Sequence, residues 1–244
     1  MLLIAIAAAA FLATLAGGLF ALRLKDSLHL VLGFSAGAVI GVAFFELLPE
    51  ALATGRNFDT PNNLLTWGAG GFLFYLILDR IALHYSELGS RGDPGAGTGL
   101  LRGTLGATSL SAHSVLDGIA IGLAFQISSA IGAIVTAGVL THDFSDGINT
   151  MSVVLKNGGG RSRALRWLVA DAVAPLAGIL LTMLFRLPEG MFGRVLAVFF
   201  GFFLYIGASD FIPESQHAHP KFYTTAMTII GAVVIYVAVN FAER

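Results

Sequence analysis

The sequence predicts an all-α protein that crosses a membrane many times. Of its 244 residues, 56% are hydrophobic and only 12% are charged, and the mean hydropathy is +0.81. Soluble domains carry about 25% charged residues, so this composition excludes the soluble enzyme classes. Apolar windows of about the 20 residues that a transmembrane helix needs alternate with polar or Gly/Pro clusters. We expect eight transmembrane helices in one domain, at residues 1–22, 28–52, 64–84, 101–125, 129–155, 164–186, 191–215 and 221–242.

The connections between these windows predict the orientation of the chain. The first window ends in small residues, as a signal peptide does, but no positive charge precedes its apolar stretch, which favours a membrane helix. The one long polar connection, residues 87–99, is rich in glycine and separates three helices from the remaining five. Lys and Arg are concentrated in the connections after the first, third, fifth and seventh windows. By the positive-inside rule, these connections face the cytoplasm and both termini lie outside.

Composition also limits the partners of the chain. The formal net charge is −1 and there is no basic run, so the chain lacks the positively charged surface that a nucleic-acid-binding protein needs. The absence of cysteine excludes disulfides, thiolate metal ligands and cysteine nucleophiles. The lipid bilayer is the remaining partner, and small-residue faces are compatible with a homodimer. Short loops and a compact chain favour a prokaryotic inner (plasma) membrane.

Two sequence motifs each occur twice. An acidic-x-x-Pro-Glu pattern begins at Glu46 in the second window and at Asp210 in the seventh. The sequences HSVLDG, from His113, and HDFSDG, from His142, lie in the fourth and fifth windows. We therefore expect a 3+2+3 arrangement, in which related halves of opposite topology, 1–86 and 164–244, flank the central pair 101–155. Transporter folds are built from such repeats, with the site at the repeat interface.

Several acids lie inside the predicted spans, where no Lys or Arg lies comparably deep. An ionisable side chain in the hydrocarbon region costs several kcal/mol, so each must be protonated or paired with a cation from outside the chain. These acids are Glu46, Asp117, Asp143, Asp146, Asp171 and Asp210.

The spacing of these acids favours a bound cation. His113 and Asp117 are four residues apart, as are His142 and Asp146, while Asp143 precedes Asp146 by three, so each set shares one helix face. Two such helices facing each other would bring two imidazoles and three carboxylates together. This donor set suits zinc, and also iron(II), manganese, cobalt, nickel or cadmium, better than calcium or magnesium. The alternative is two buried polar networks that fix helix packing.

Other polar residues have two interpretations each. Glu46 and Asp210 are candidate gate ligands, or carboxylates that reach the interface. Asp171 is a candidate second-site ligand, or a hydrogen-bonded packing acid. Candidates for the pathway or for metal release, which are otherwise solvated or packing groups, are Ser114, Glu50, Glu214, His217 and His219.

The sequence resembles the ZIP (Zrt/Irt-like) divalent metal transporters over nearly the whole chain. The features that carry this resemblance are the paired HSVLDG and HDFSDG motifs, the repeated pattern in ELLPE and DFIPE, and the eight spans. The resemblance implies a transport site for one or two metal ions midway through the membrane, with transport toward the cytoplasm. Its ligands would be His113, Asp117, His142, Asp143 and Asp146. Many members have a Glu-Pro pair in the sixth span. Here the nearest acid to Pro175 is Asp171, one turn earlier. A second metal site therefore requires Asp171 to take the place of the glutamate in that pair.

We therefore expect a divalent transition-metal transporter and not an enzyme, with zinc as the first candidate and iron, manganese and cadmium as others. The metal would be its cargo, and no catalytic cofactor is needed. One alternative is an intramembrane hydrolase in which the same side chains hold zinc and activate water. The second motif lacks the His-Glu-x-x-His spacing of common zinc proteases. Another alternative is a proton-coupled carrier of a different solute that uses the acids as a relay.

Overall fold

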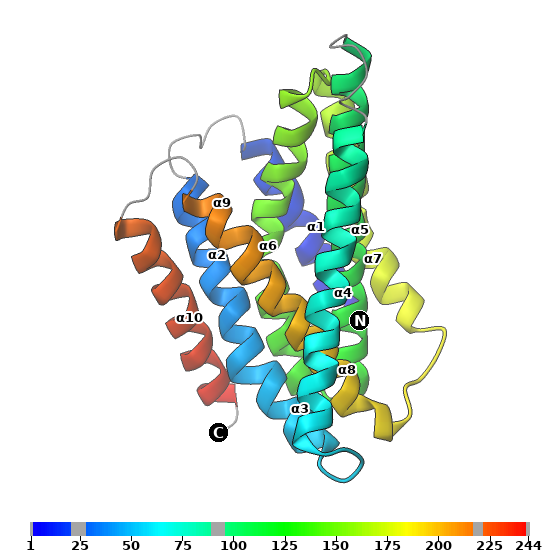
Figure 1. Cartoon of the computed structure of the whole chain (residues 1–244), viewed down its shortest axis with the longest axis vertical. Coiled ribbons are helices and arrows are strands. Elements are labelled where there is room, and N and C mark those ends of the chain that lie inside the picture. The colour runs from blue at the N-terminus through cyan, green and yellow to red at the C-terminus, as the bar shows by residue number, and fades with distance from the viewer. Residues whose placement is uncertain (1, 21–27, 89–95, 217–221, 243–244) are drawn as a thin grey trace. The chain divides into compact units, whose positions relative to one another are not determined.

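The computed structural model is built from helices (Figure 1), and it describes residues 2–20, 28–88, 96–216 and 222–242. No strand occurs in these ranges, which confirms the all-α prediction. The α-helices are α1 (Leu2–Phe20), α2 (Leu28–Val42), α3 (Leu48–Gly55), α4 (Pro61–Leu88), α5 (Ala96–Ile127), α6 (Ser129–Lys156), α7 (Arg161–Thr182), α8 (Glu189–Tyr205), α9 (Ile212–Gln216) and α10 (Phe222–Ala242). Two π-helical segments, η1 (Ala43–Leu47) and η2 (Ile206–Phe211), continue α2 into α3 and α8 into α9.

These helices match the predicted windows closely. Among the described residues, 7 helices are long and apolar enough to cross a membrane, so the protein is a multi-pass membrane protein. The predicted fifth span, α6, is not among them, because its window contains His142, Asp143 and Asp146. Its 28 residues are nevertheless long enough to cross the hydrocarbon core. The polar connection expected at 87–99 is shorter, since α4 continues to Leu88 and α5 begins at Ala96.

The chain forms two compact units. Unit 1 comprises Met1–Lys25, Ile77–Ile119 and Asp143–Met183, and unit 2 comprises Asp26–Leu76, Ala120–His142 and Leu184–Arg244. Three of the boundaries between the two units lie within the continuous helices α4, α5 and α6. Both α1 and α7 belong entirely to unit 1 as far as they are described.

In unit 2, glycines allow close helix pairs. The helices α2 and α10 run side by side (Figure 1), and a side chain at Gly37 would overlap the backbone of Thr228. The helix α8 packs in the same manner against α4, where a side chain at Gly201 would overlap the carbonyl oxygen of Gly68. Without a hydrophobic driving force in lipid, such small-residue contacts are a main source of helix association.

In unit 1, the glycine of each HxxxDG motif is pressed against another helix. A Cβ atom at Gly118 of α5 would overlap the carbonyl oxygen of Pro175 on α7. A Cβ atom at Gly147 of α6 would overlap the carbonyl oxygen of Thr14 on α1. Each motif aspartate directly precedes such a glycine, so backbone contact with α7 or α1 fixes the helix at the point where Asp117 or Asp146 projects.

The acidic-x-x-Pro-Glu pattern coincides with a π-helical segment both times. Glu46 lies in η1 and Asp210 in η2. Pro49 and Pro213 lack the N–H that would complete the α-helical ladder, and the residue before each proline bonds instead to the carbonyl five positions back. The sequence predicts an interruption at these prolines but not its form.

Candidate metal site

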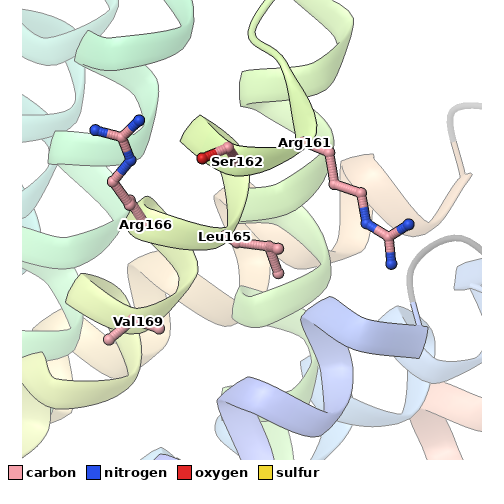
Figure 2. Close-up of a pocket in the computed structure, with 5 residues that line it drawn as sticks. All are labelled: Arg161, Ser162, Leu165, Arg166 and Val169. Atoms are coloured by element: carbon pink, nitrogen blue, oxygen red, sulfur yellow. The ribbon is translucent and has the colours of Figure 1, made fainter.

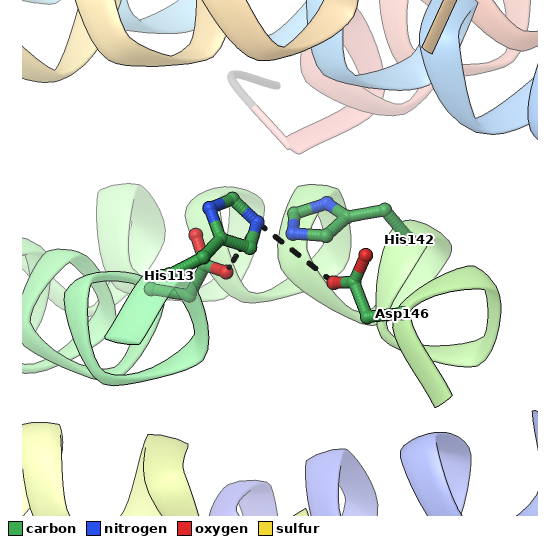
Figure 3. A group of neighbouring side chains, drawn as sticks. His113, His142 and Asp146 are labelled. Carbon is green, nitrogen blue, oxygen red and sulfur yellow. Dashed lines mark ion pairs between the residues drawn. The ribbon is translucent and has the colours of Figure 1, made fainter. Parts of the chain in front are cut away.

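Four buried side chains converge where α5 and α6 carry their HxxxDG motifs (Figure 3). His113 and Asp117 come from α5, and His142 and Asp146 come from α6. One ligand atom of each lies within 4.8 Å of all the others, and each residue is at most 8% exposed. In the part of the chain that the structure describes, this is the only group of three or more side chains so arranged. We call these four residues the His/Asp cluster.

The distances in the cluster are close to those that a bound ion needs. The Nε2 atom of His113 lies 3.2 Å from Oδ2 of Asp117 and 3.8 Å from Oδ2 of Asp146. Four ligands around zinc at about 2.0 Å lie about 3.3 Å from one another in a tetrahedron. All four ligand atoms lie within 4.8 Å of one another, so binding zinc would draw the side chains inward. In Figure 3, the side chains of His113, His142 and Asp146 point toward one shared space.

The tautomer of His142 is set by its own helix. Its Nδ1 atom lies 3.1 Å from the carbonyl oxygen of Gly138, and because a carbonyl can only accept, Nδ1 carries the proton. The lone pair of the neutral ring is then on Nε2. Metal-binding histidines commonly have their second nitrogen held in this way. The ring is completely buried and lies against the rings of Phe203 and Phe211, at centroid distances of 6.4 and 5.7 Å.

Asp143, a ligand predicted from the sequence, is buried but lies outside the His/Asp cluster. Successive side chains of an α-helix are rotated by about 100° around the helix axis. Asp143 directly follows His142, so its side chain projects farther from the direction of His142 than that of Asp146, which lies about one full turn later. Ser114 has the same place in the first motif, directly after His113, and its hydroxyl points to α7.

Asp171 of α7 is completely buried and also lies outside the cluster. Its Oδ1 atom accepts a hydrogen bond from Ser114 at 2.9 Å, and its Oδ2 atom accepts one from Thr150 at 2.8 Å. Sequence reasoning missed Thr150. Its position four residues after Asp146, on the same face of α6, is the sequence feature that could have identified it.

Comparison with known proteins gives the family. The profile described as ZIP zinc transporter matches residues 93–238, more than half of the chain. The chain belongs to the ZIP family. Zinc transporter ZIP13 of Pongo abelii is 24% identical over 224 residues, which cover 87% of this chain and 66% of that protein. ZIP13 of Homo sapiens is 25% identical over 267 residues, with 90% and 71% covered, and ZIP4 of Mus musculus is 29% identical over 109 residues, with 45% and 16% covered.

Membership in the ZIP family confirms the predicted resemblance. Its members are transporters and not enzymes, so the hydrolase alternative is not supported. In a ZIP protein the metal is the transported substrate, as the sequence predicts, and no catalytic cofactor is expected. The chain spans about two thirds of the Pongo abelii relative.

Among the remaining candidate residues whose side chains the structure describes, Glu46, Glu50 and Glu214 do not belong to the His/Asp cluster of this ZIP protein. Glu46 is 7% exposed and lies in η1, and Asp210 has its backbone in η2. Glu50 is half-buried and accepts a hydrogen bond of 2.7 Å from the hydroxyl of Thr54. Glu214 is exposed, as expected for a solvated group. The candidate release histidines His217 and His219 lie outside the described residues.

A separate pocket of about 680 Å³ lies at the start of α7 (Figure 2). It is open, and the side chains of Arg161 and Arg166 extend to opposite sides of it. No imidazole or carboxylate is among its lining residues. These residues are Arg161, Ser162, Leu165, Arg166 and Val169.

Proposed function

We propose that this ZIP protein carries divalent transition metal ions, zinc foremost, across the membrane toward the cytoplasm through the His/Asp cluster. The convergence of two imidazoles and two carboxylates in the interior of a membrane protein supports this proposal most directly. Buried carboxylates carry a large desolvation cost, which a divalent cation offsets. The names of the relatives, all described as zinc transporters, agree with this cargo.

The donor set also limits which ions can pass. Imidazole nitrogen and carboxylate oxygen suit zinc, iron(II), manganese or cadmium, whereas calcium and magnesium prefer shells made only of oxygen. Transport requires binding strong enough to dehydrate the ion and weak enough to release it. A site without thiolates meets both requirements. We propose Glu46 and Asp210 as gate ligands on the path, and both residues belong to π-helical segments, η1 and η2.

We also propose that residues 1–86 and 164–244 are inverted repeats around the central pair 101–155. The contacts of unit 1 support this. In an inverted repeat, α5 would be equivalent to α6, and α7 would be equivalent to α1. The Gly118 contact with Pro175 of α7 then corresponds to the Gly147 contact with Thr14 of α1. In unit 2, the pair α2 and α10 corresponds to the pair α8 and α4.

Uptake of zinc and cadmium into proteoliposomes tests the proposed function. The wild-type protein is compared with a variant that carries both His113→Ala and Asp146→Ala. We expect metal flux in the wild type and none in the double variant, with both proteins inserted equally well. His84→Ala is a matched control and should transport normally, since this histidine is exposed on α4 and does not belong to the cluster. Wild-type flux in the double variant would refute the assignment of the cluster.

A further inference from the structure

Asp171 is a completely buried acid whose role the transport proposal leaves open. Each of its carboxylate oxygens accepts one hydrogen bond from a hydroxyl group, Ser114 at 2.9 Å and Thr150 at 2.8 Å. Ser114 belongs to α5 and Thr150 belongs to α6. One carboxylate on α7 therefore joins the two helices that supply the metal ligands, and all three residues lie in unit 1.

The two hydroxyl groups are close in the chain to ligands of the His/Asp cluster. Ser114 directly follows His113, and Thr150 lies one helical turn after Asp146 on the same face of α6. A shift of the helix backbone at Ser114 or Thr150 would therefore also shift the neighbouring ligand. The helix that carries Asp171 is itself firmly held, because Pro175, one turn later, is in backbone contact with Gly118 of α5.

The surroundings of Asp171 suit hydrogen bonding better than metal binding. Zinc takes imidazole, thiolate or carboxylate ligands, and the only converging group of these within the described ranges is the His/Asp cluster, which excludes Asp171. The two hydroxyl donors engage both oxygens of Asp171 and offset part of the cost of burying it.

We infer that Asp171 is a positioning residue, which fixes the ligand pairs of α5 and α6 through Ser114 and Thr150, and that the chain binds one transported ion at a time instead of two. This inference rests on the proposed transport function. It assigns to Asp171 an indirect role, in which the carboxylate sets the geometry of the ligands and does not touch the ion.

The test compares Asp171→Asn, Asp171→Ala and the double variant Ser114→Ala/Thr150→Val with the wild type. An asparagine amide can accept from one hydroxyl and donate to the other, because hydroxyl groups do both, so Asp171→Asn retains the links and removes only the charge. Three quantities are measured: the zinc stoichiometry by equilibrium dialysis, the visible spectrum of the Co²⁺-loaded protein, and KM and Vmax for zinc uptake.

We expect one zinc ion per chain in all four proteins. Asp171→Asn should have a wild-type cobalt spectrum and a KM near that of the wild type. Asp171→Ala and the double variant should bind zinc about 10- to 100-fold more weakly, the usual effect of removing a group that holds a ligand in place. Their cobalt spectra should shift, because the ligands move, and a purely structural loss that leaves the bound site intact would not produce that shift.

Two results would overturn the inference alone: two zinc ions in the wild type with one lost in Asp171→Ala, or an Asp171→Asn variant as impaired as Asp171→Ala. In both cases the wild type still takes up zinc, so the proposed function would stand. A wild-type protein that neither binds nor transports a metal would instead overturn the proposed function and this inference with it.

Discussion

At the scale of single residues, the charge state of the His/Asp cluster decides whether an ion can bind. His113 lies within 3.8 Å of carboxylates from both α5 and α6, and His142 has its Nδ1 proton engaged by Gly138. Each imidazole therefore offers one nitrogen, and that nitrogen must be unprotonated to accept a metal. Protons and metal ions compete for the same atoms.

We expect uptake to weaken as the pH falls. Protonation of the imidazoles and aspartates removes metal ligands, so KM for zinc should rise as the pH is lowered. Initial rates in proteoliposomes with equal pH on both sides measure this. A KM that falls with acidification would contradict the account, and empty liposomes correct for leakage.

The spacing of residues predicts the four members of the cluster and predicts less about their neighbours. His113, Asp117, His142 and Asp146 could be found because a separation of four residues is one helical turn. Asp143 was placed beside them by its separation of three from Asp146 and by the ZIP resemblance, and its role as a ligand stays a prediction, since the group of converging side chains does not contain it. The hydrogen bond from Ser114 to Asp171 could not be predicted, because it joins residues 57 positions apart and depends on how α5 packs against α7.

At the scale of helices, backbone contact at small residues fixes the motif segments. The Cβ of any residue larger than glycine at position 147 would overlap the carbonyl oxygen of Thr14. The sequence shows a glycine after each motif aspartate, but only the structure shows that α1 and α7 are the helices in contact. The π-helical segments are a similar case. Pro49 and Pro213 predict that the α-helical hydrogen bonds are interrupted, but not that the interruption takes the form of a π-helix.

We expect Gly147→Ala to destabilise the protein by about 1–3 kcal/mol, the usual cost of an added carbon in a packed interior. The midpoint of thermal unfolding in detergent measures the effect. Gly70→Ala on α4 is the matched control, because nothing lies within 4 Å of its added Cβ, and helix propensity favours alanine there by about 0.5–1 kcal/mol. An unchanged midpoint in Gly147→Ala would show that α1 and α6 are not in firm contact.

At the scale of the whole molecule, composition predicts the all-α membrane fold, and 7 helices within the described ranges are long and apolar enough to cross a membrane, against eight predicted. The windows at 28–52 and 191–215 correspond to α2 through α3 and α8 through α9, although the pattern of apolar residues gave no sign of the segments between them. The homodimer stays a prediction, and glycines of the kind on which it rests, such as Gly37 and Gly201, pack within unit 2.

The predicted orientation can be measured with single cysteines, because the chain has none of its own. Asn62→Cys, at the start of α4, should react with a membrane-impermeant maleimide in intact cells. Ser162→Cys, at the start of α7, should react only after the membrane is opened, since the basic connections face the cytoplasm. Both positions are exposed, so accessibility within the protein does not bias the comparison. The opposite labelling pattern would reverse the topology.

The central claim is that the His/Asp cluster binds the transported ion, and X-ray absorption spectroscopy of the zinc-loaded protein tests it most directly. We expect a first shell of nitrogen and oxygen at about 2.0 Å with scattering from two imidazoles. His142→Ala should remove one imidazole from that shell, while His84→Ala should leave it unchanged. A zinc shell that is the same in His142→Ala as in the wild type would contradict the account.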